Sequence, residues 1–190
     1  RAMAAAAANG GRSQSVGGQT RPGCVSIMTV HRSKGLEFPV VFVADTDHKF
    51  NQSDAIRPVL THSRLGVGVM LRAPRAAKRF KTLPYAALAQ AIRTETLSEE
   101  MRVLYVALTR AQDALIITVP LKKTASALKT PALCAAAEAT GSESMRSMGS
   151  WAGWILTAAM LHPDSDALWG YTSFLPHHRP TEVPLTIRLG

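Results

Sequence analysis

Short apolar runs alternate with polar turns along the first half of the chain. Residues 25–30 (VSIMTV) and 40–45 (VVFVAD) are rich in β-branched residues and nearly continuous in apolar character. Residues 114–120 (ALIITVP) repeat this pattern. Strands of a parallel sheet that is covered on both faces have such sequences, so we expect three buried strands.

A long helical pattern separates the second strand from the third. It begins at Pro84, which suits a first helical turn, and runs to Ala111 without a helix breaker. Apolar residues spaced by three and four positions predict one buried face: Leu97, Met101, Leu104, Leu108 and Ala111. Thr96 followed by Glu99 also fits a capping box that would begin a second helix. The order strand, strand, helix, strand predicts an α/β fold with a mainly parallel sheet flanked by helices and at least one right-handed crossover.

The segments outside this pattern divide the chain. Residues 9–24 are rich in Gly and Ser, which predicts a linker or flexible tail over residues 1–24, although the alanine run at 4–8 resembles the frayed end of a helix. Residues 46–83 look irregular, with room for short strands within 58–71.

The last third of the chain predicts helices at about 124–139 and 147–161 and an edge strand at 183–189. The second of these helices carries an apolar stripe that is typical of ordinary core: Trp151, Trp154, Ile155 and Ala158. We therefore expect residues 123–190 to form a helical extension with a Pro-rich tail.

The charge balance points to a polyanionic partner. The chain has 22 Lys and Arg against 13 Asp and Glu, a net charge of +9, and nucleic acid is the first candidate. A basic surface that faces an acidic neighbour within a larger protein is the alternative. The chain begins with Arg1 rather than Met, so we expect a piece of such a protein.

Other features of composition suggest a cytoplasmic setting. No apolar run approaches the roughly 20 residues that a bilayer span needs. Cys24 and Cys134 lack the spacing of metal ligands and are too few for a disulfide framework, which favours reduced thiols.

The turn after residues 25–30 gathers hydrogen-bond donors. Thr29, His31, Ser33 and Lys34 suit phosphate oxygens, and Gly35 allows close approach of the backbone. The stretch is not a Walker A loop, because its Lys precedes the Gly and the earlier glycine is missing. A purely structural turn is the alternative for this stretch taken alone.

Arg110 lies at the C-terminal end of the long predicted helix. A structural interpretation is that its charge interacts with the helix dipole. A functional one is an arginine finger, which stabilises charge on a departing γ-phosphoryl group.

Two blocks of sequence resemble known motifs. Residues 25–43 (VSIMTVHRSKGLEFPVVFV) and 98–118 (SEEMRVLYVALTRAQDALIIT) are similar to the fifth and sixth helicase motifs of the UvrD/Rep-type superfamily 1 DNA helicases. The stretches 49–69, 81–88 and 150–168 resemble the AddA family, the helicase/nuclease subunits of bacterial double-strand-break repair.

This resemblance implies that residues 25–122 are the C-terminal part of a second RecA-like motor domain of the P-loop NTPase fold. Arg110 would then be the finger, and Gly35 and Glu37 would approach the nucleotide, the Glu through its ribose. Thr29, His31, Ser33 and Lys34 would contact single-stranded DNA.

The resemblance also implies the cofactors and partners. A complete parent would use ATP and Mg²⁺ held by its first RecA-like domain, and would act on single- or double-stranded DNA in the bacterial cytoplasm at the nucleoid, with an AddB-like nuclease subunit as a candidate partner. The isolated chain would bind neither ATP nor a metal and would be inactive. A non-catalytic module that binds nucleic acid or protein is the alternative function.

Weaker patterns favour ordinary structure. Asp45, Asp47 and His48 resemble a solvated loop more than a metal site, and residues 66–68 lack the third glycine of a dinucleotide site. His177 and His178 have no third ligand nearby. A solvated face is the simpler interpretation of the basic run, which comprises Arg72, Arg75, Lys78, Arg79 and Lys81.

Overall fold

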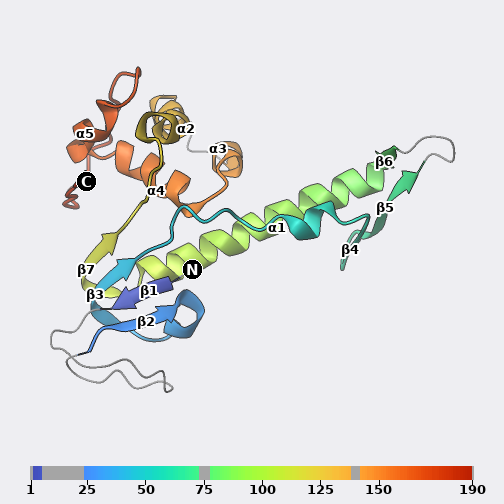
Figure 1. Cartoon of the computed structure of the whole chain (residues 1–190), viewed down its shortest axis with the longest axis horizontal. Coiled ribbons are helices and arrows are strands. Elements are labelled where there is room, and N and C mark those ends of the chain that lie inside the picture. Colours follow the sequence, from blue (N-terminus) through green and yellow to red (C-terminus); the bar gives the residue numbers. More distant parts are fainter. Residues whose placement is uncertain (1, 6–23, 73–77, 138–141, 190) are drawn as a thin grey trace. The chain divides into compact units, whose positions relative to one another are not determined.

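The computed structural model describes residues 2–5, 24–72, 78–137 and 142–189 (Figure 1). The chain forms two compact units, Arg1–Lys49 with Val103–Gly190 and Phe50–Arg102, and the boundary between them falls within one long helix. Among the described residues, none of the helices has both the length and the apolar character that a membrane crossing requires.

The first unit is built on a four-stranded sheet of order β2-β1-β3-β7. Its strands are β1 (Ala2–Ala5), β2 (Ser26–Thr29), β3 (Phe38–Val43) and β7 (Ala111–Ile117). β1 is antiparallel to both β2 and β3, and β3 pairs in parallel with β7, so β2, β3 and β7 all run in the same direction. The three strands predicted from sequence are therefore confirmed, with β3 beginning two residues and β7 three residues earlier than expected.

The N-terminal end differs from its prediction. Ala4 and Ala5 belong to strand β1 and not to a frayed helix or a flexible tail, because they pair with strands on both sides. The Gly/Ser-rich part of the predicted linker, residues 6–23, lies outside the described residues.

The strands are less buried than the sequence predicted. Phe38, Val41 and Val43 of β3 are buried, but Ile27 of β2 is 76% exposed and most of β7 is exposed. The expectation of strands covered on both faces is thus correct only for the central strand. The described helices leave much of β2 and β7 uncovered.

Helix α1 (Leu83–Leu108) is a single helix of 26 residues, as predicted. The hydroxyl of Thr96 donates to the carbonyl of Ile92 one turn earlier, so Thr96 does not cap a second helix. The predicted buried face is largely wrong: Leu104 is buried, but Leu97, Leu108 and Ala111 are only half-buried and Met101 is 40% exposed.

The second unit packs the start of α1 against an antiparallel sheet. The sheet has the order β4-β5-β6 and comprises β4 (Val59–His62), β5 (Gly66–Arg72) and β6 (Arg79–Lys81), preceded by the 3-10 turn η2 (Ser53–Ile56). Leu60, Tyr85 and Leu88 form the centre of its core. Gly68 is required there, because a Cβ atom would lie 2.7 Å from the Tyr85 Cα. The short strands expected within 58–71 are confirmed.

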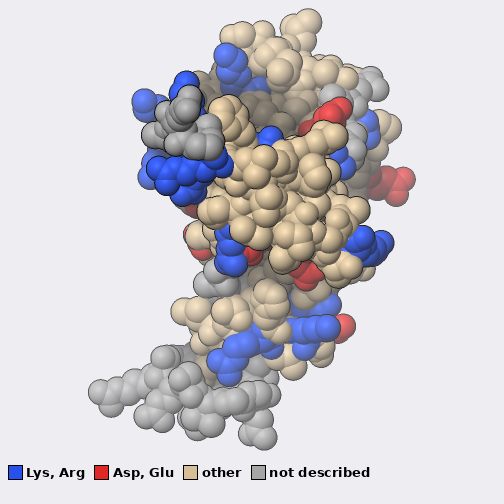
Figure 2. All heavy atoms as spheres, turned by 90° about the vertical axis from the view of Figure 1, so that its right-hand side faces the viewer, with Lys and Arg blue, Asp and Glu red and all other residues tan. Residues whose placement is uncertain are grey.

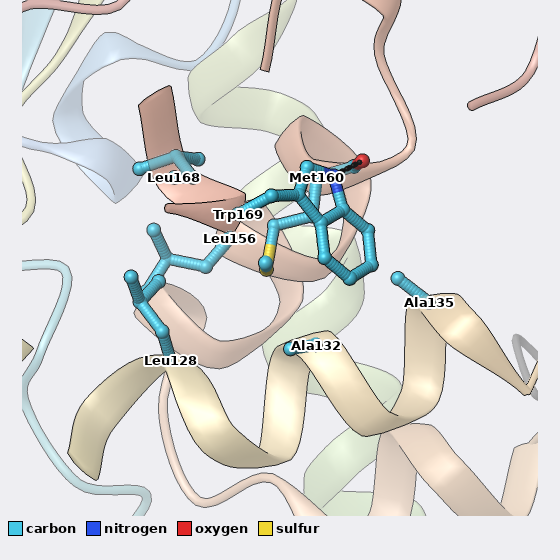
Figure 3. Close-up of a cluster of buried hydrophobic side chains, with 7 residues drawn as sticks. All are labelled: Leu128, Ala132, Ala135, Leu156, Met160, Leu168 and Trp169. Carbon is cyan, nitrogen blue, oxygen red and sulfur yellow. Dashed lines mark hydrogen bonds between the residues drawn. The ribbon is translucent and has the colours of Figure 1, made fainter. Parts of the chain in front are cut away.

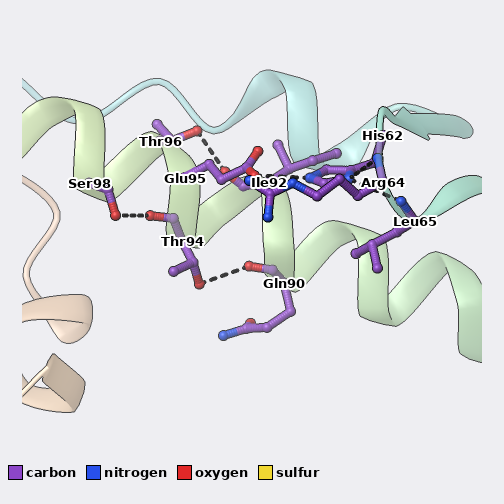
Figure 4. A network of polar contacts seen from close by, with 9 residues as sticks. All are labelled: His62, Arg64, Leu65, Gln90, Ile92, Thr94, Glu95, Thr96 and Ser98. Atoms are coloured by element: carbon purple, nitrogen blue, oxygen red, sulfur yellow. Dashed lines mark hydrogen bonds and ion pairs between the residues drawn. The ribbon is translucent and has the colours of Figure 1, made fainter.

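A polar contact fixes the β4–β5 turn to α1 (Figure 4). The Nδ1 atom of His62 accepts hydrogen bonds from the backbone N–H groups of Arg64 and Leu65, at 3.2 and 3.3 Å. The proton of the neutral ring therefore resides on Nε2, which donates to Glu95 Oε1 at 3.0 Å. The hairpin is in this way held on the helix.

The C-terminal part of the first unit is helical. It contains α2 (Thr124–Ala136), α3 (Ser142–Ser147), α4 (Trp151–Met160), the 3-10 turn η3 (Pro163–Ser165) and α5 (Asp166–Trp169). α4 begins at Trp151, four residues later than predicted. Ala158, expected in its apolar stripe, is exposed, and residues 183–189 form no strand, so both expectations were wrong.

These helices enclose a core of seven buried residues (Figure 3). They are Leu128, Ala132, Ala135, Leu156, Met160, Leu168 and Trp169. The indole Nε1 of Trp169 donates to the carbonyl of Met160 at 2.9 Å, so the one polar atom of this large side chain is satisfied.

Candidate functional site

The segment between β2 and β3 connects opposite ends of the sheet. It begins with the 3-10 turn η1 (Val30–Ser33) at the carboxyl end of β2 and enters β3 at its amino end. Because β2 and β3 run in the same direction, the segment must return along the strands. The pairing registers separate Thr29 from Glu37 by about seven strand positions, on the order of 20 Å.

Backbone geometry explains the path of this loop. The Leu36 N–H donates to the Ser33 carbonyl at 3.0 Å and closes the turn. Gly35 lies within this turn with a φ of +81°, which L-residues rarely adopt, and a Cβ atom built there would meet nothing within 4 Å. The backbone at Gly35 is therefore open to close approach by a ligand, as the sequence predicted.

The loop presents a basic surface at the β2 end. Thr29, His31, Arg32 and Lys34 are exposed, and Thr29 makes no capping hydrogen bond through its side chain. Ser33 differs: its side chain is fully buried, and its hydroxyl donates to the Val30 carbonyl at 2.8 Å. The predicted contact of Ser33 with DNA is thus not supported, because this hydroxyl stabilises the turn.

Arg110 connects the end of α1 to the start of β3. Its Nε donates to the Val106 carbonyl at 2.9 Å, and its Nη1 donates to the Leu36 carbonyl at 3.0 Å. Its Nη2 donates to the Thr109 hydroxyl at 3.1 Å. The structural interpretation of Arg110 is therefore realised, since a carbonyl of the last helical turn receives its charge. A guanidinium has five N–H donors, so one on each terminal nitrogen is still available to another acceptor.

Glu37 lies at the same edge of the sheet as Arg110. Phe38 pairs with Ala111 in the β3–β7 ladder, so the residues just before them, Glu37 and Arg110, are neighbours across the two strands. The Phe38 N–H also donates to the Arg110 carbonyl at 2.9 Å. An exposed carboxylate and a half-buried guanidinium thus meet where the two strands begin.

Sequence reasoning missed one member of this group. Gln112 donates through Nε2 to Glu37 Oε2 at 3.1 Å, which holds the carboxylate at the edge. Gln112 stands two residues after Arg110 in the sixth-motif block, and that proximity was the signal available. Glu37, Arg110 and Gln112 together form what we call the strand-start cluster.

The weaker candidates form no ligand site. Asp45 has a φ of 58° and its carbonyl accepts from the His48 N–H at 3.4 Å, as in an ordinary turn. His178 lies 3.4 Å from an Asp166 carboxylate oxygen. Within the described part of the chain, no group of three or more His, Cys, Asp and Glu residues is placed to hold a metal ion. Arg75 of the basic run lies outside the described residues.

Comparison with known proteins gives consistent matches. Residues 11–122, more than half of the chain, match the family described as UvrD-like helicase C-terminal domain. Curated relatives named as AddA-type ATP-dependent helicase/nuclease subunits are 50% identical over 94 residues in Ruminiclostridium cellulolyticum, covering 50% of this chain and 8% of the relative. The Lactiplantibacillus plantarum protein is 34% identical over 176 residues, covering 90% and 14%. The Moorella thermoacetica protein is 39% identical over 148 residues, covering 76% and 10%. The chain therefore spans about one tenth of the length of these relatives.

Proposed function

Because the chain belongs to the UvrD-like helicase C-terminal domain family, we propose that it works as part of an ATP-dependent DNA helicase of the AddA helicase/nuclease type. In this proposal residues 25–122 are the C-terminal part of a second RecA-like motor domain. Residues 123–190 are a helical extension of it. A first motor domain elsewhere in the parent protein holds ATP and Mg²⁺.

The strand-start cluster is the observation that carries this proposal. A nucleotide held by another domain needs a cation to stabilise charge on its transferring phosphoryl group and a polar group for its sugar. Arg110 and Glu37 supply these two chemistries from adjacent strand ends. The hydrogen bonds from Arg110 to Val106 and Leu36 keep its guanidinium at the edge in advance, which lowers the cost of positioning it.

The other end of the loop is suited to DNA. Thr29, His31 and Lys34 are exposed donors at the carboxyl end of β2, about 20 Å along the sheet from Glu37. A single short segment therefore joins the proposed nucleotide contact to the proposed DNA contact. Movement of the Glu37 end during ATP binding would shift the DNA-contacting end, which is how hydrolysis would be coupled to translocation along the strand.

The proposed setting follows from the same relatives. The parent would act on DNA in the bacterial cytoplasm, in double-strand-break repair and recombination, together with an AddB-like nuclease subunit. The chain by itself would hydrolyse no ATP, because the phosphates and Mg²⁺ are bound by the first motor domain.

Replacing Arg110 in the full-length protein tests the proposal. We expect Arg110→Ala to lower the rate constant of ATP hydrolysis by about 10³-fold while ATP binding is preserved. The matched control is Arg102→Ala, because Arg102 is an exposed arginine of the same helix whose side chain pairs with Glu99. Near-normal hydrolysis by Arg110→Ala would leave Arg110 with its structural role alone.

A second candidate function is a nucleic-acid-binding module without catalysis. It is favoured by the net charge of +9 and by the exposed side chains of His31, Arg32 and Lys34. In this case the isolated chain should bind a single-stranded oligonucleotide, with an affinity that falls steeply as salt rises. His31→Ala with Lys34→Ala should weaken this binding at least about tenfold, and binding that is equal in the double variant would reject the module.

A further inference from the structure

The antiparallel sheet of the second unit has one face that no described element covers. Strand alternation places Leu60, Gly68 and Met70 on the side that packs against α1. The cross-strand pairs Val59↔Val69, Thr61↔Val67 and Leu71↔Phe80 place the remaining residues on the other side. We call this set of six residues the outer face.

The outer face is apolar although it is exposed. Five of its six residues are hydrophobic, and Val67, Leu71 and Phe80 are 61%, 57% and 54% exposed. Side chains that alternate along paired strands form a continuous surface. Contiguous apolar surface of a few hundred Å² on a folded unit commonly marks an interaction site.

The sequence around this face is basic. Residues 57–81 contain seven Lys and Arg and no Asp or Glu. Arg64, Arg72, Lys78, Arg79 and Lys81 are exposed at the turn and strand ends that border the face. Figure 2 looks toward the side of the molecule where Figure 1 shows β4, β5 and β6, and there uncharged surface is bordered mostly by Lys and Arg.

We infer that the outer face is a docking surface for a protein segment that presents apolar side chains bordered by Asp and Glu. The apolar centre would be buried by the partner, and the basic border would pair with its carboxylates. This inference goes beyond the helicase assignment and does not depend on Arg110 or Glu37.

The composition of the face favours such a partner over the alternatives. A second copy of the chain would bring a net charge of +9 against the same basic border. Single-stranded nucleic acid is bound mainly by aromatic stacking, and Phe80 is the only aromatic residue of the face. Three short valine side chains on a flat sheet also insert poorly into a lipid surface, whereas they pack well against another protein surface.

The core of the unit stays separate from the face, so the face can be altered without unfolding. Leu60 and Tyr85 are buried on the opposite side, and the His62–Glu95 contact fixes the hairpin to the helix from that side (Figure 4). Polar substitutions of Val67 and Leu71 therefore change surface that is already in contact with water.

The test uses a designed amphipathic helical peptide with a leucine stripe flanked by glutamates. Its binding to the 190-residue chain is measured by fluorescence anisotropy over a series of salt concentrations. We expect saturable binding that weakens as salt rises, and at least about tenfold weaker binding of a matched peptide with lysines in place of the glutamates.

Variants of the face show where the peptide binds. Val67→Lys with Leu71→Lys should lower the affinity at least about tenfold, because docking would bury unpaired charge. Val67→Thr should lower it less and keeps the β-branched shape. Leu175→Lys is the matched control, since Leu175 is an exposed apolar residue outside this unit. Thermal unfolding of each variant, followed by circular dichroism, confirms that it remains folded.

Three results would overturn the inference. One is peptide binding that is absent or is unchanged by the paired lysine substitutions. Another is a single-stranded oligonucleotide or an anionic vesicle that binds in preference to the peptide and binds more tightly to the lysine variant. The third is a dimer of the wild-type chain in sedimentation that the lysine substitutions dissociate.

Discussion

The C-terminal helices and the four-stranded sheet of the first unit differ in how they bury apolar residues. Leu128, Ala132, Ala135 and Met160 are completely buried in the helical core. Leu115 and Ile116 of β7 are about 40% exposed. The helices thus complete a core with residues of this chain, whereas the sheet that carries the strand-start cluster does so only at β3. The candidate site therefore depends on a few specific hydrogen bonds more than on a dense core.

Breaking the helical core should have the largest effect on stability. We expect Leu128→Ala to lower the free energy of unfolding by about 2–5 kcal/mol, because it leaves a cavity among fully buried neighbours. Urea denaturation followed by circular dichroism measures this change. Leu133→Ala is the control on the same helix, because Leu133 is exposed and its truncation should cost less than about 0.5 kcal/mol. Equal losses in the two variants would contradict the burial described here.

Thr46 connects the two regions and gives an intermediate effect. Its hydroxyl donates to the Thr118 carbonyl beyond β7 at 2.8 Å, and its own carbonyl accepts from the Ala152 N–H of α4 at 2.7 Å. Thr46→Val keeps the shape and removes the donor, so we expect a loss of about 1–2 kcal/mol in the free energy of unfolding. Thr46→Ser, which keeps the hydroxyl, should recover most of it.

Amide hydrogen exchange locates the effect of Thr46→Val. Faster exchange at the start of α4 and the end of β7, with the α2–α4 core unchanged, would show that the hydroxyl fixes the junction. Faster exchange throughout the helices would show instead that the sheet and the helical core unfold together.

The order of strands and the long helix could be predicted from the sequence because local patterns determine them. Apolar β-branched runs marked β2, β3 and β7, and an unbroken helical pattern marked α1. The clustering of Arg110 with Glu37 could be expected only through the resemblance to helicase motifs. The β3–β7 register that brings these residues together is a non-local pairing, which local patterns do not specify.

Burial was the property that sequence predicted least well. Leu115 and Met101 have the character of core residues, yet a hydrophobic pattern indicates which side is apolar and not whether another element covers it. The same reason explains the outer face of the second unit, where Val67 and Leu71 alternate correctly but remain exposed. Ser33 failed for a different reason, because a hydroxyl that is able to reach a ligand also competes for a nearby carbonyl.

Substitution on the edge strand should have the smallest effect on stability and tests the comparison most directly. We expect Ile116→Thr to change the free energy of unfolding by less than about 0.5 kcal/mol, because threonine keeps the β-branched shape and the side chain is already 40% exposed. Urea denaturation at two protein concentrations measures it. A loss above about 1.5 kcal/mol would mean that β7 is covered in solution, and the sheet would then resemble the helical core. If that loss grows with protein concentration, a second copy of the chain supplies the cover, because association stabilises the folded state by mass action.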